Sequence, residues 1–118
     1  MMRMNGHIYL RPGNMLRDFE VYVSTGAVSK SGRPQTAYEK NGTVIRGVLS
    51  DASSSEEVTW YQMGHPITHK IVQRGSRKAK ETDKLVMGER IFLIQGADDV
   101  SDLGMVTIYY VQERYDID

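Results

Sequence analysis

Cysteine is absent from this sequence of 118 residues. Such a chain can form neither a disulfide scaffold nor a thiolate metal cluster, and its composition fits a reducing compartment. Long apolar runs are absent as well, because the longest, residues 91–94, is far short of the roughly 18 residues of a membrane span. Residues 1–10 also lack the apolar stretch of a secretory signal. We therefore expect no membrane partner.

Net charge is also lacking, since 15 basic and 15 acidic side chains balance. Nothing in the overall charge therefore points to nucleic acid. The charges are nevertheless segregated along the chain. The stretch 70–80 contains no acid but several cations, namely Lys70, Arg74, Arg77, Lys78 and Lys80. The stretch from 98 onward contains Arg114 as its one cation and the acids Asp98, Asp99, Asp102, Glu113, Asp116 and Asp118.

Two interpretations of this segregation stay open. Both groups can be solvated patches on a monomer. Alternatively, the basic patch of one subunit meets the acidic edge of its neighbour in a ring, because complementary patches set the orientation of partners. The subunit interface would then consist of Lys70, Arg74, Arg77, Lys78 and Lys80 on one side and Asp98, Asp99 and Asp102 on the other.

Familiar catalytic motifs are missing too. There is no GxGxxG, no Walker loop and no HExxH. Serines 53–55 lie next to Glu56 and Glu57, but hydroxyls and carboxylates are ordinary loop and cap chemistry, and no spacing here orients a base toward a nucleophile. We expect a protein that is not an enzyme, with no catalytic or cofactor-binding residue and no cofactor.

His65 and His69 are four residues apart, which on a helix would place both imidazoles on one face. Pro66 and the run that follows it instead favour a strand, on which four residues span roughly 13 Å. Zn–N bonds are only about 2 Å long, so the two side chains cannot share an ion. We expect no metal site, and a packed, hydrogen-bonded His69 between Ile67 and Ile71.

Apolar and polar residues alternate in several short segments, as in half-buried strands. These expected strands are residues 19–23, 43–50, 67–75, 83–86, 89–100 and 104–113. Turns are expected at Asn41-Gly42 and Met87-Gly88, and Gly47 indicates a bulge or a sharp bend within its strand. The pattern predicts an all-β domain over 14–118, a small antiparallel β-barrel or sandwich of five to six strands, after an N-terminal arm, 1–13.

One long connection, residues 50–66, interrupts the strands and contains the single tryptophan. Ser54 lies three residues before Glu57, a capping-box spacing, and Gly64 suits a helix C-terminus. A short helix near 54–63 is expected, with a flexible serine-rich loop as the alternative. Connections longer than a small β domain needs are often functional.

Three segments in order resemble the bacteriophage head–tail joining family, the head-closure or stopper proteins of long-tailed phages and related prophages. "PGNMLRDFEVYVST" at 12–25 resembles the opening and first strand of that family. "GVLSDASSSEEVTWYQMGHPITHKIVQRG" at 47–75 resembles its central stretch, and "DKLVMGERIFLIQGADDVSDLGMVTIYYVQE" at 83–113 its closing unit. The resemblance covers roughly residues 12–115, and residues 1–11 have no counterpart.

The resemblance implies a structural role. Family members are small β-barrels that join a ring beneath the portal and its adaptor, retain packaged double-stranded DNA without sequence-specific contact, and offer a docking surface to tail proteins. The chain would then be found at the head–tail interface of the virion, after assembly in the host bacterial cytoplasm. On this hypothesis the excursion is a channel gate formed by Ser53, Ser54, Ser55, Glu56, Glu57, Trp60, Tyr61 and Gln62.

Particular roles within the gate follow from the same resemblance. Glu56 and Glu57 would face DNA, where carboxylates repel phosphates and keep the channel from sticking. Trp60, Tyr61 and Met63 would anchor the loop on a neighbouring subunit, since aromatic residues and Met are favoured in interface cores. Equally, Trp60 and Met63 would cap the barrel of their own subunit.

Two alternatives for the function remain. One is another neck or tail-completion protein, although adaptors of that region are expected to be mainly helical. The other is an OB-like nucleic-acid-binding barrel, in which Tyr109 or Tyr110 would stack on bases. That alternative needs a single basic face made of Arg74, Arg77, Lys78 and Lys80.

Overall fold

The computed structural model describes residues 15–24, 38–100 and 103–115, so the expected N-terminal arm 1–13 lies outside the described residues. Within these ranges no helix is long and apolar enough to cross a membrane. The elements in chain order are β1 (Leu16–Ser24), β2 (Tyr38–Asp51), α2 (Ser54–Gln62), β3 (His69–Arg74), β4 (Lys84–Met87), β5 (Arg90–Asp99) and β6 (Val106–Arg114).

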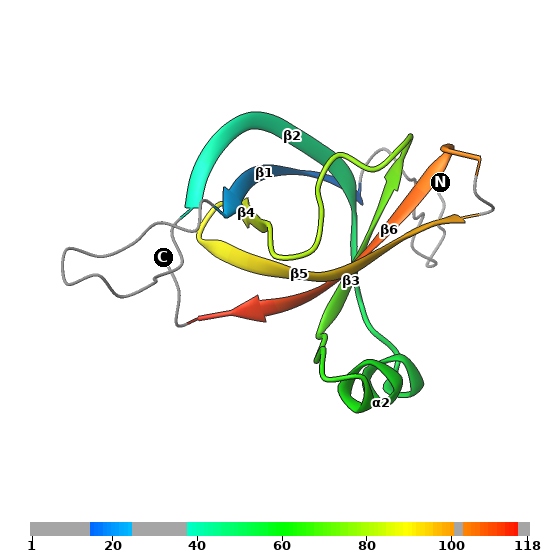
Figure 1. Cartoon of the computed structure of the whole chain (residues 1–118). Coiled ribbons are helices and arrows are strands. Elements are labelled where there is room, and N and C mark those ends of the chain that lie inside the picture. Colours follow the sequence, from blue (N-terminus) through cyan, green and yellow to red (C-terminus); the bar gives the residue numbers. More distant parts are fainter. Residues whose placement is uncertain (1–14, 25–37, 101–102, 116–118) are drawn as a thin grey trace, which may run out of the picture.

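The strands close into an antiparallel barrel in the order β1-β2-β3-β6-β5-β4 (Figure 1). The ring is uneven: β1 pairs with β2 over most of its length, but with β4 only from Glu20 to Tyr22. Each of these strands therefore has a neighbour on both sides, although parts of β1, β2 and β5 are paired on one side only. The predicted all-β fold is confirmed, in its barrel form.

Alternate residues of the strands fill the interior, as period-two patterning requires. The two phenylalanines, Phe19 and Phe92, meet edge to face with their ring centroids 6.0 Å apart. Val21 lies beside Phe19 on the same buried face, as predicted for residues 19–23. The remaining large members of the core are Ile45, Ile71, Leu85, Ile94, Tyr109 and Val111.

Strand β2 is longer than expected, because Asn41-Gly42 does not end it. The chain continues through this dipeptide, and the register shifts opposite Glu20 and Tyr22 of β1. Gly42 has φ +83°, a conformation that glycine adopts freely, so a signal expected for a turn serves an irregularity inside the strand. Met87-Gly88 does form the expected turn, between β4 and β5.

Gly47 does not form a bulge, which was one of the two features expected there. Its register with both neighbouring strands is continuous, opposite Arg17 in β1 and Gln73 in β3. A Cβ atom placed on Gly47 would lie 2.7 Å from the carbonyl oxygen of Val72. Glycine is therefore needed here because the backbones of β2 and β3 approach closely at this position.

Candidate functional site

The excursion between β2 and β3 contains a helix with a complete capping box. The Ser53 hydroxyl accepts a hydrogen bond from Glu56 N at 3.2 Å, and a carboxylate oxygen of Glu56 accepts one from Ser53 N at 2.9 Å. The expected box of Ser54 and Glu57 is therefore wrong by one residue. Three consecutive serines and two consecutive glutamates satisfy the same spacing twice, so the pattern could not fix the first residue of the helix.

The far end of α2 agrees with the prediction. The helix ends at Gln62, Met63 caps it, and Gly64 follows in a left-handed conformation with φ +82°. The alternative of a flexible serine-rich loop is thus replaced by an ordered helix, which projects from one end of the barrel (Figure 1).

Two contacts fix α2 to its own barrel. The Trp60 ring stacks on Tyr110 with centroids 4.8 Å apart, and it covers Gly96, the cross-strand partner of Tyr110. Lys70 of β3 donates to both carboxylate oxygens of Glu56, at 3.3 and 3.2 Å. The hydrogen bond from Ser53 N lowers the pKa of the Glu56 carboxyl, and Lys70 lowers it further.

These contacts divide the predicted gate residues into two faces. Glu56 and Trp60 are half-buried toward the barrel, so Glu56 is bound to Lys70 and Trp60 anchors its own subunit. Trp60 thus packs on the barrel of its own subunit, which is the second of the two roles considered for it. The outward residues include Ser53, Ser54, Ser55, Glu57, Tyr61 and Gln62.

The outward face of α2 also contains exposed apolar side chains. Val58, Tyr61 and Met63 are 55%, 73% and 54% exposed, respectively. Met63 therefore does not cap the barrel in the way that Trp60 does. Large exposed apolar side chains grouped on one short helix are typical of a contact surface.

His69 is packed and hydrogen-bonded, as expected. Its Nδ1 is 2.7 Å from the Thr68 hydroxyl, its Nε2 is 3.3 Å from a carboxylate oxygen of Asp51, and its ring meets Phe92 edge to face. His65 lies beyond α2 and is exposed. Among residues 15–24, 38–100 and 103–115, no group of three or more histidine or acidic side chains could hold a metal ion.

An ion pair between the exposed Arg90 and the largely buried Glu113 joins β5 to β6 near His69. Arg90 donates to both carboxylate oxygens of Glu113, at 2.8 and 2.9 Å, and Glu113 N donates to the Thr68 hydroxyl. The Glu113 side chain is only 8% exposed, and the Arg90 guanidinium holds the pKa of its carboxyl below the usual range.

This ion pair predicts a specific pH dependence. Because the folded-state pKa of Glu113 is lowered, its stabilisation is fully present above the ordinary value of about 4.5 and is lost as the pH falls through the lowered folded value. Glu113→Gln should therefore cost about 1 kcal/mol at pH 7 and progressively less in acid. Urea unfolding of both proteins between pH 7 and pH 3 measures this difference, and a difference that stays constant with pH would contradict it.

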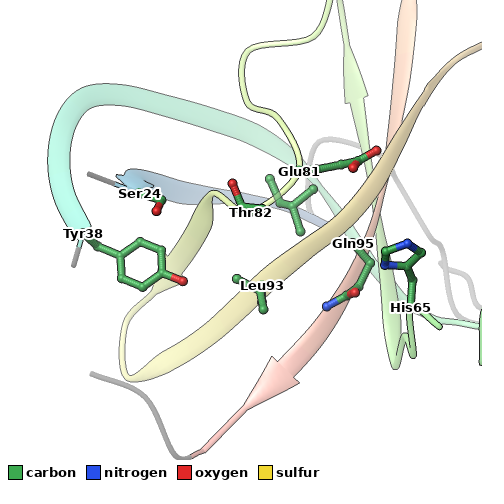
Figure 2. Close-up of a pocket in the computed structure, with 8 residues that line it drawn as sticks. Ser24, Tyr38, His65, Glu81, Thr82, Leu93 and Gln95 are labelled. Carbon is green, nitrogen blue, oxygen red and sulfur yellow. The ribbon is translucent and has the colours of Figure 1, made fainter. Parts of the chain in front are cut away.

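An open pocket of about 360 Å³ lies beside the barrel, and it contains residue types found in hydrolases (Figure 2). Ser24 and His65 lie at opposite ends of it, with Glu81 and Gln95 nearer His65. Within the part of the chain that the structure describes, no hydrogen bond joins Ser24, His65 and Glu81.

The basic loop (residues 75–83, between β3 and β4) is fastened to the barrel by buried polar groups. Tyr109 is fully buried, donates its hydroxyl to Gln73 Oε1 and accepts a hydrogen bond from Lys78 N at 2.9 Å. Gln73 in turn donates to the Ser76 carbonyl at 2.7 Å, and Thr107 to the Gly75 carbonyl at 2.9 Å.

This arrangement corrects the stacking role considered for the two tyrosines. Tyr109 points into the core, and Tyr110 is covered by Trp60, so neither ring is free to stack on a base. The basic side chains Arg77, Lys78 and Lys80 are exposed on the loop.

Removing the buried hydroxyl should destabilise the barrel. Tyr109→Phe leaves Gln73 Oε1 and Lys78 N without their partner, at a cost of about 1–3 kcal/mol. Tyr61→Phe, which removes a hydroxyl from a 73% exposed ring, is the matched control and should change little. Chemical unfolding measures both, and equal midpoints for the two variants would refute the role of the network.

The residues predicted to form a subunit interface do not gather into two opposing patches. Lys70 is paired with Glu56 beside α2, whereas Arg74 lies at the other end of β3. Arg74 is paired with Val106 and Asp99 with Thr107, so Arg74 lies at the same end of the barrel as Asp98 and Asp99, with β6 between them. Asp102 lies outside the described residues, as do Asp116 and Asp118.

Sequence reasoning missed Gly96, on which α2 rests. An isolated glycine in a strand signals a bulge or a close approach, and that signal was available in the run 89–100. The register does shift between Ile94 and Gly96, and the Trp60 ring occupies the space that a side chain on Gly96 would fill.

Comparison with known proteins shows a likeness of fold. No protein-family model matches the sequence, and no curated protein does. The fold is similar to that of a chain in a solved structure described as "Virion of native gene transfer agent (GTA) particle", with a TM-score of 0.59 and 17% sequence identity. The match covers 83% of this chain and 94% of the other, so the likeness extends over almost the whole fold.

Proposed function

We propose that this chain is a non-enzymatic structural subunit of the neck of a phage-like particle. It closes the packaged head, retains DNA and provides the surface on which the tail docks. The observation that carries the proposal is the shared barrel fold of a chain in a gene transfer agent virion, matched over 94% of that chain. The ordered resemblance of residues 12–115 to the head–tail joining family supports the same role.

In this proposal α2 is the gate element of a homo-oligomeric ring beneath an adaptor ring. Its outward surface combines serine hydroxyls with the exposed carboxylate of Glu57, while the neighbouring cation, Lys70, is bound to Glu56. Such a surface repels phosphates weakly and does not hold them, which suits a channel that double-stranded DNA must leave quickly. Glu57, and not Glu56, is therefore the carboxylate assigned to face DNA.

The alternatives make different predictions. Another neck or tail-completion protein of the same fold would sit elsewhere in the particle. A nucleic-acid-binding barrel would need base-stacking rings, and Tyr109 and Tyr110 are both covered. The neck proposal therefore predicts no measurable binding of free DNA at physiological salt, and tight binding that weakens steeply with added salt would favour the nucleic-acid-binding barrel.

Deleting the chain from its particle tests the role directly. We expect heads that fill with DNA but then lose it and fail to accept tails. The purified chain should restore both DNA retention and tail attachment. Heads that lack the chain but still retain DNA and attach tails normally would sink the proposal.

A further inference from the structure

An apolar groove of about 600 Å³ runs over the outer surface of β1, β2, β3 and the start of β6. Apolar side chains of four strands line it. These are Leu16, Val44, Val48, Val72 and Val106. Valines on the outer face of a barrel are not needed for its core, so this surface has a composition suited to a partner.

Three cations line the apolar surface, namely Arg46, Arg74 and Lys78, and no acid among residues 15–24, 38–100 and 103–115 lines the groove. All three are exposed. Asp18 is the cross-strand neighbour of Arg46, but among the described residues no acidic oxygen lies within 4.0 Å of these three side chains. An occupant of complementary chemistry is therefore a short peptide that alternates apolar and acidic side chains.

The chain itself contains such a segment at residues 115–118, which read Tyr-Asp-Ile-Asp. Tyr115 is 88% exposed, so its large ring is left uncovered at the end of β6. Two apolar and two acidic side chains alternate there, matching an apolar groove with a basic rim.

The segment cannot reach the Val106 end of the groove of its own subunit. Val106, in the groove, and Arg114, next to the segment, lie at opposite ends of β6, which extends roughly 27 Å between them at about 3.3 Å per residue (Figure 1). Three residues beyond Tyr115 reach at most about 11 Å. The groove of a second copy has no such constraint.

We propose that the groove receives residues 115–118 of a neighbouring copy, with Tyr115 and Ile117 on the valines and Asp116 and Asp118 toward the cations. Two different surfaces of each subunit are then used, a heterologous contact that closes into a ring when its rotation permits. This inference takes the ring from the proposed function. The acidic side of the contact between subunits then consists of residues 115–118, in place of the stretch that contains Asp98 and Asp99.

The competing occupant is the preceding segment, 1–14, which is attached beside Leu16. It contains Arg3 and Arg11 and no acid, so its charge opposes that of the groove rim. Nucleic acid has the right charge but would leave the apolar floor unmatched. Charge and apolar pattern together therefore favour residues 115–118.

Cross-linking tests this contact in the full chain, because the protein has no cysteine of its own. Purified Val44→Cys and Ile117→Cys chains are mixed and treated with a short bis-maleimide. We expect this pair to form mixed dimers at least tenfold faster than a control pair in which Val58→Cys takes the place of Val44→Cys. Val58 is a matched control because Val44 and Val58 are 46% and 55% exposed and differ mainly in their position on the surface. Equal rates would overturn the proposal.

Charge reversal distinguishes the occupants. Asp116→Lys with Asp118→Lys in the Ile117→Cys chain should reduce the rate to that of the control, and Arg46→Glu with Arg74→Glu in the Val44→Cys partner should restore it. An intrachain cross-link between Val44→Cys and Ile8→Cys, with none to Ile117→Cys, would assign the groove to segment 1–14 instead. If the cross-linking or the charge-reversal result differs from the expected one, particles that lack the chain are still expected to lose DNA. Such a result would therefore refute this contact and not the neck role.

Discussion

Replacing Gly96 by valine is expected to detach α2 from the barrel while the barrel itself stays folded. A Cβ atom on Gly96 would lie 2.6 and 2.9 Å from two ring carbons of Trp60, so the ring must leave Tyr110. Gly96 does not have a left-handed φ, so the substitution fills space without straining the backbone. The lost stacking and burial correspond to about 2–3 kcal/mol of helix docking.

The single tryptophan makes this change easy to measure. In Gly96→Val, Trp60 fluorescence should shift to the red and become accessible to quenchers, as the ring moves from Tyr110 into water. Tyr61→Ala, on the outward face of the same helix, is the control and should leave the spectrum unchanged. A native spectrum for Gly96→Val would show that α2 is not held by this contact. In particles, the same variant should leak DNA.

Replacing Gly47 by valine should have the largest effect on folding. The new Cβ would lie 2.7 Å from the Val72 carbonyl oxygen and 3.0 Å from a methyl group of Ile71, and a backbone atom cannot move aside as a side-chain end can. Strands β2 and β3 must separate, at a cost of about 3 kcal/mol or more. Gly47→Ala should show a smaller loss in the same direction.

Urea unfolding followed by circular dichroism measures this loss. Val44→Ala on the outward face of the same strand is the control, because Val44 is 46% exposed and its change should stay within about 0.5 kcal/mol. If Gly47→Val unfolds at the same urea concentration as Val44→Ala, the close approach of β2 and β3 is not what requires glycine.

The strand pattern was predictable because it depends on local alternation. Phe19 and Val21 lie inside as expected, and the Met87-Gly88 turn joins β4 to β5. The turn predicted at Asn41-Gly42 was wrong. A left-handed glycine is compatible with a turn and with an irregularity inside a strand, and only the pairing of β2 with β1 decides between the two. The closing of the barrel by β1 and β4 is likewise a long-range contact that no local pattern specifies.

The candidate site was predictable in position but not in orientation. The length of the excursion and its tryptophan marked it, yet the direction of Trp60 depends on Gly96 and Tyr110, which are far along the chain and meet only through the pairing of β5 with β6. The ion pair of Glu56 was not predictable for the same reason, because its partner, Lys70, comes from β3. Charge segregation along the sequence also failed to specify spatial separation, since Arg74 and Asp99 share one end of the barrel.

Cryo-electron microscopy of complete particles that contain this chain tests the central claim most directly. The account predicts a ring of six-stranded barrels between the adaptor and the tail, with α2 and its exposed Glu57 toward the channel axis. Particles in which this barrel is found only outside the neck, or not at all, would contradict it.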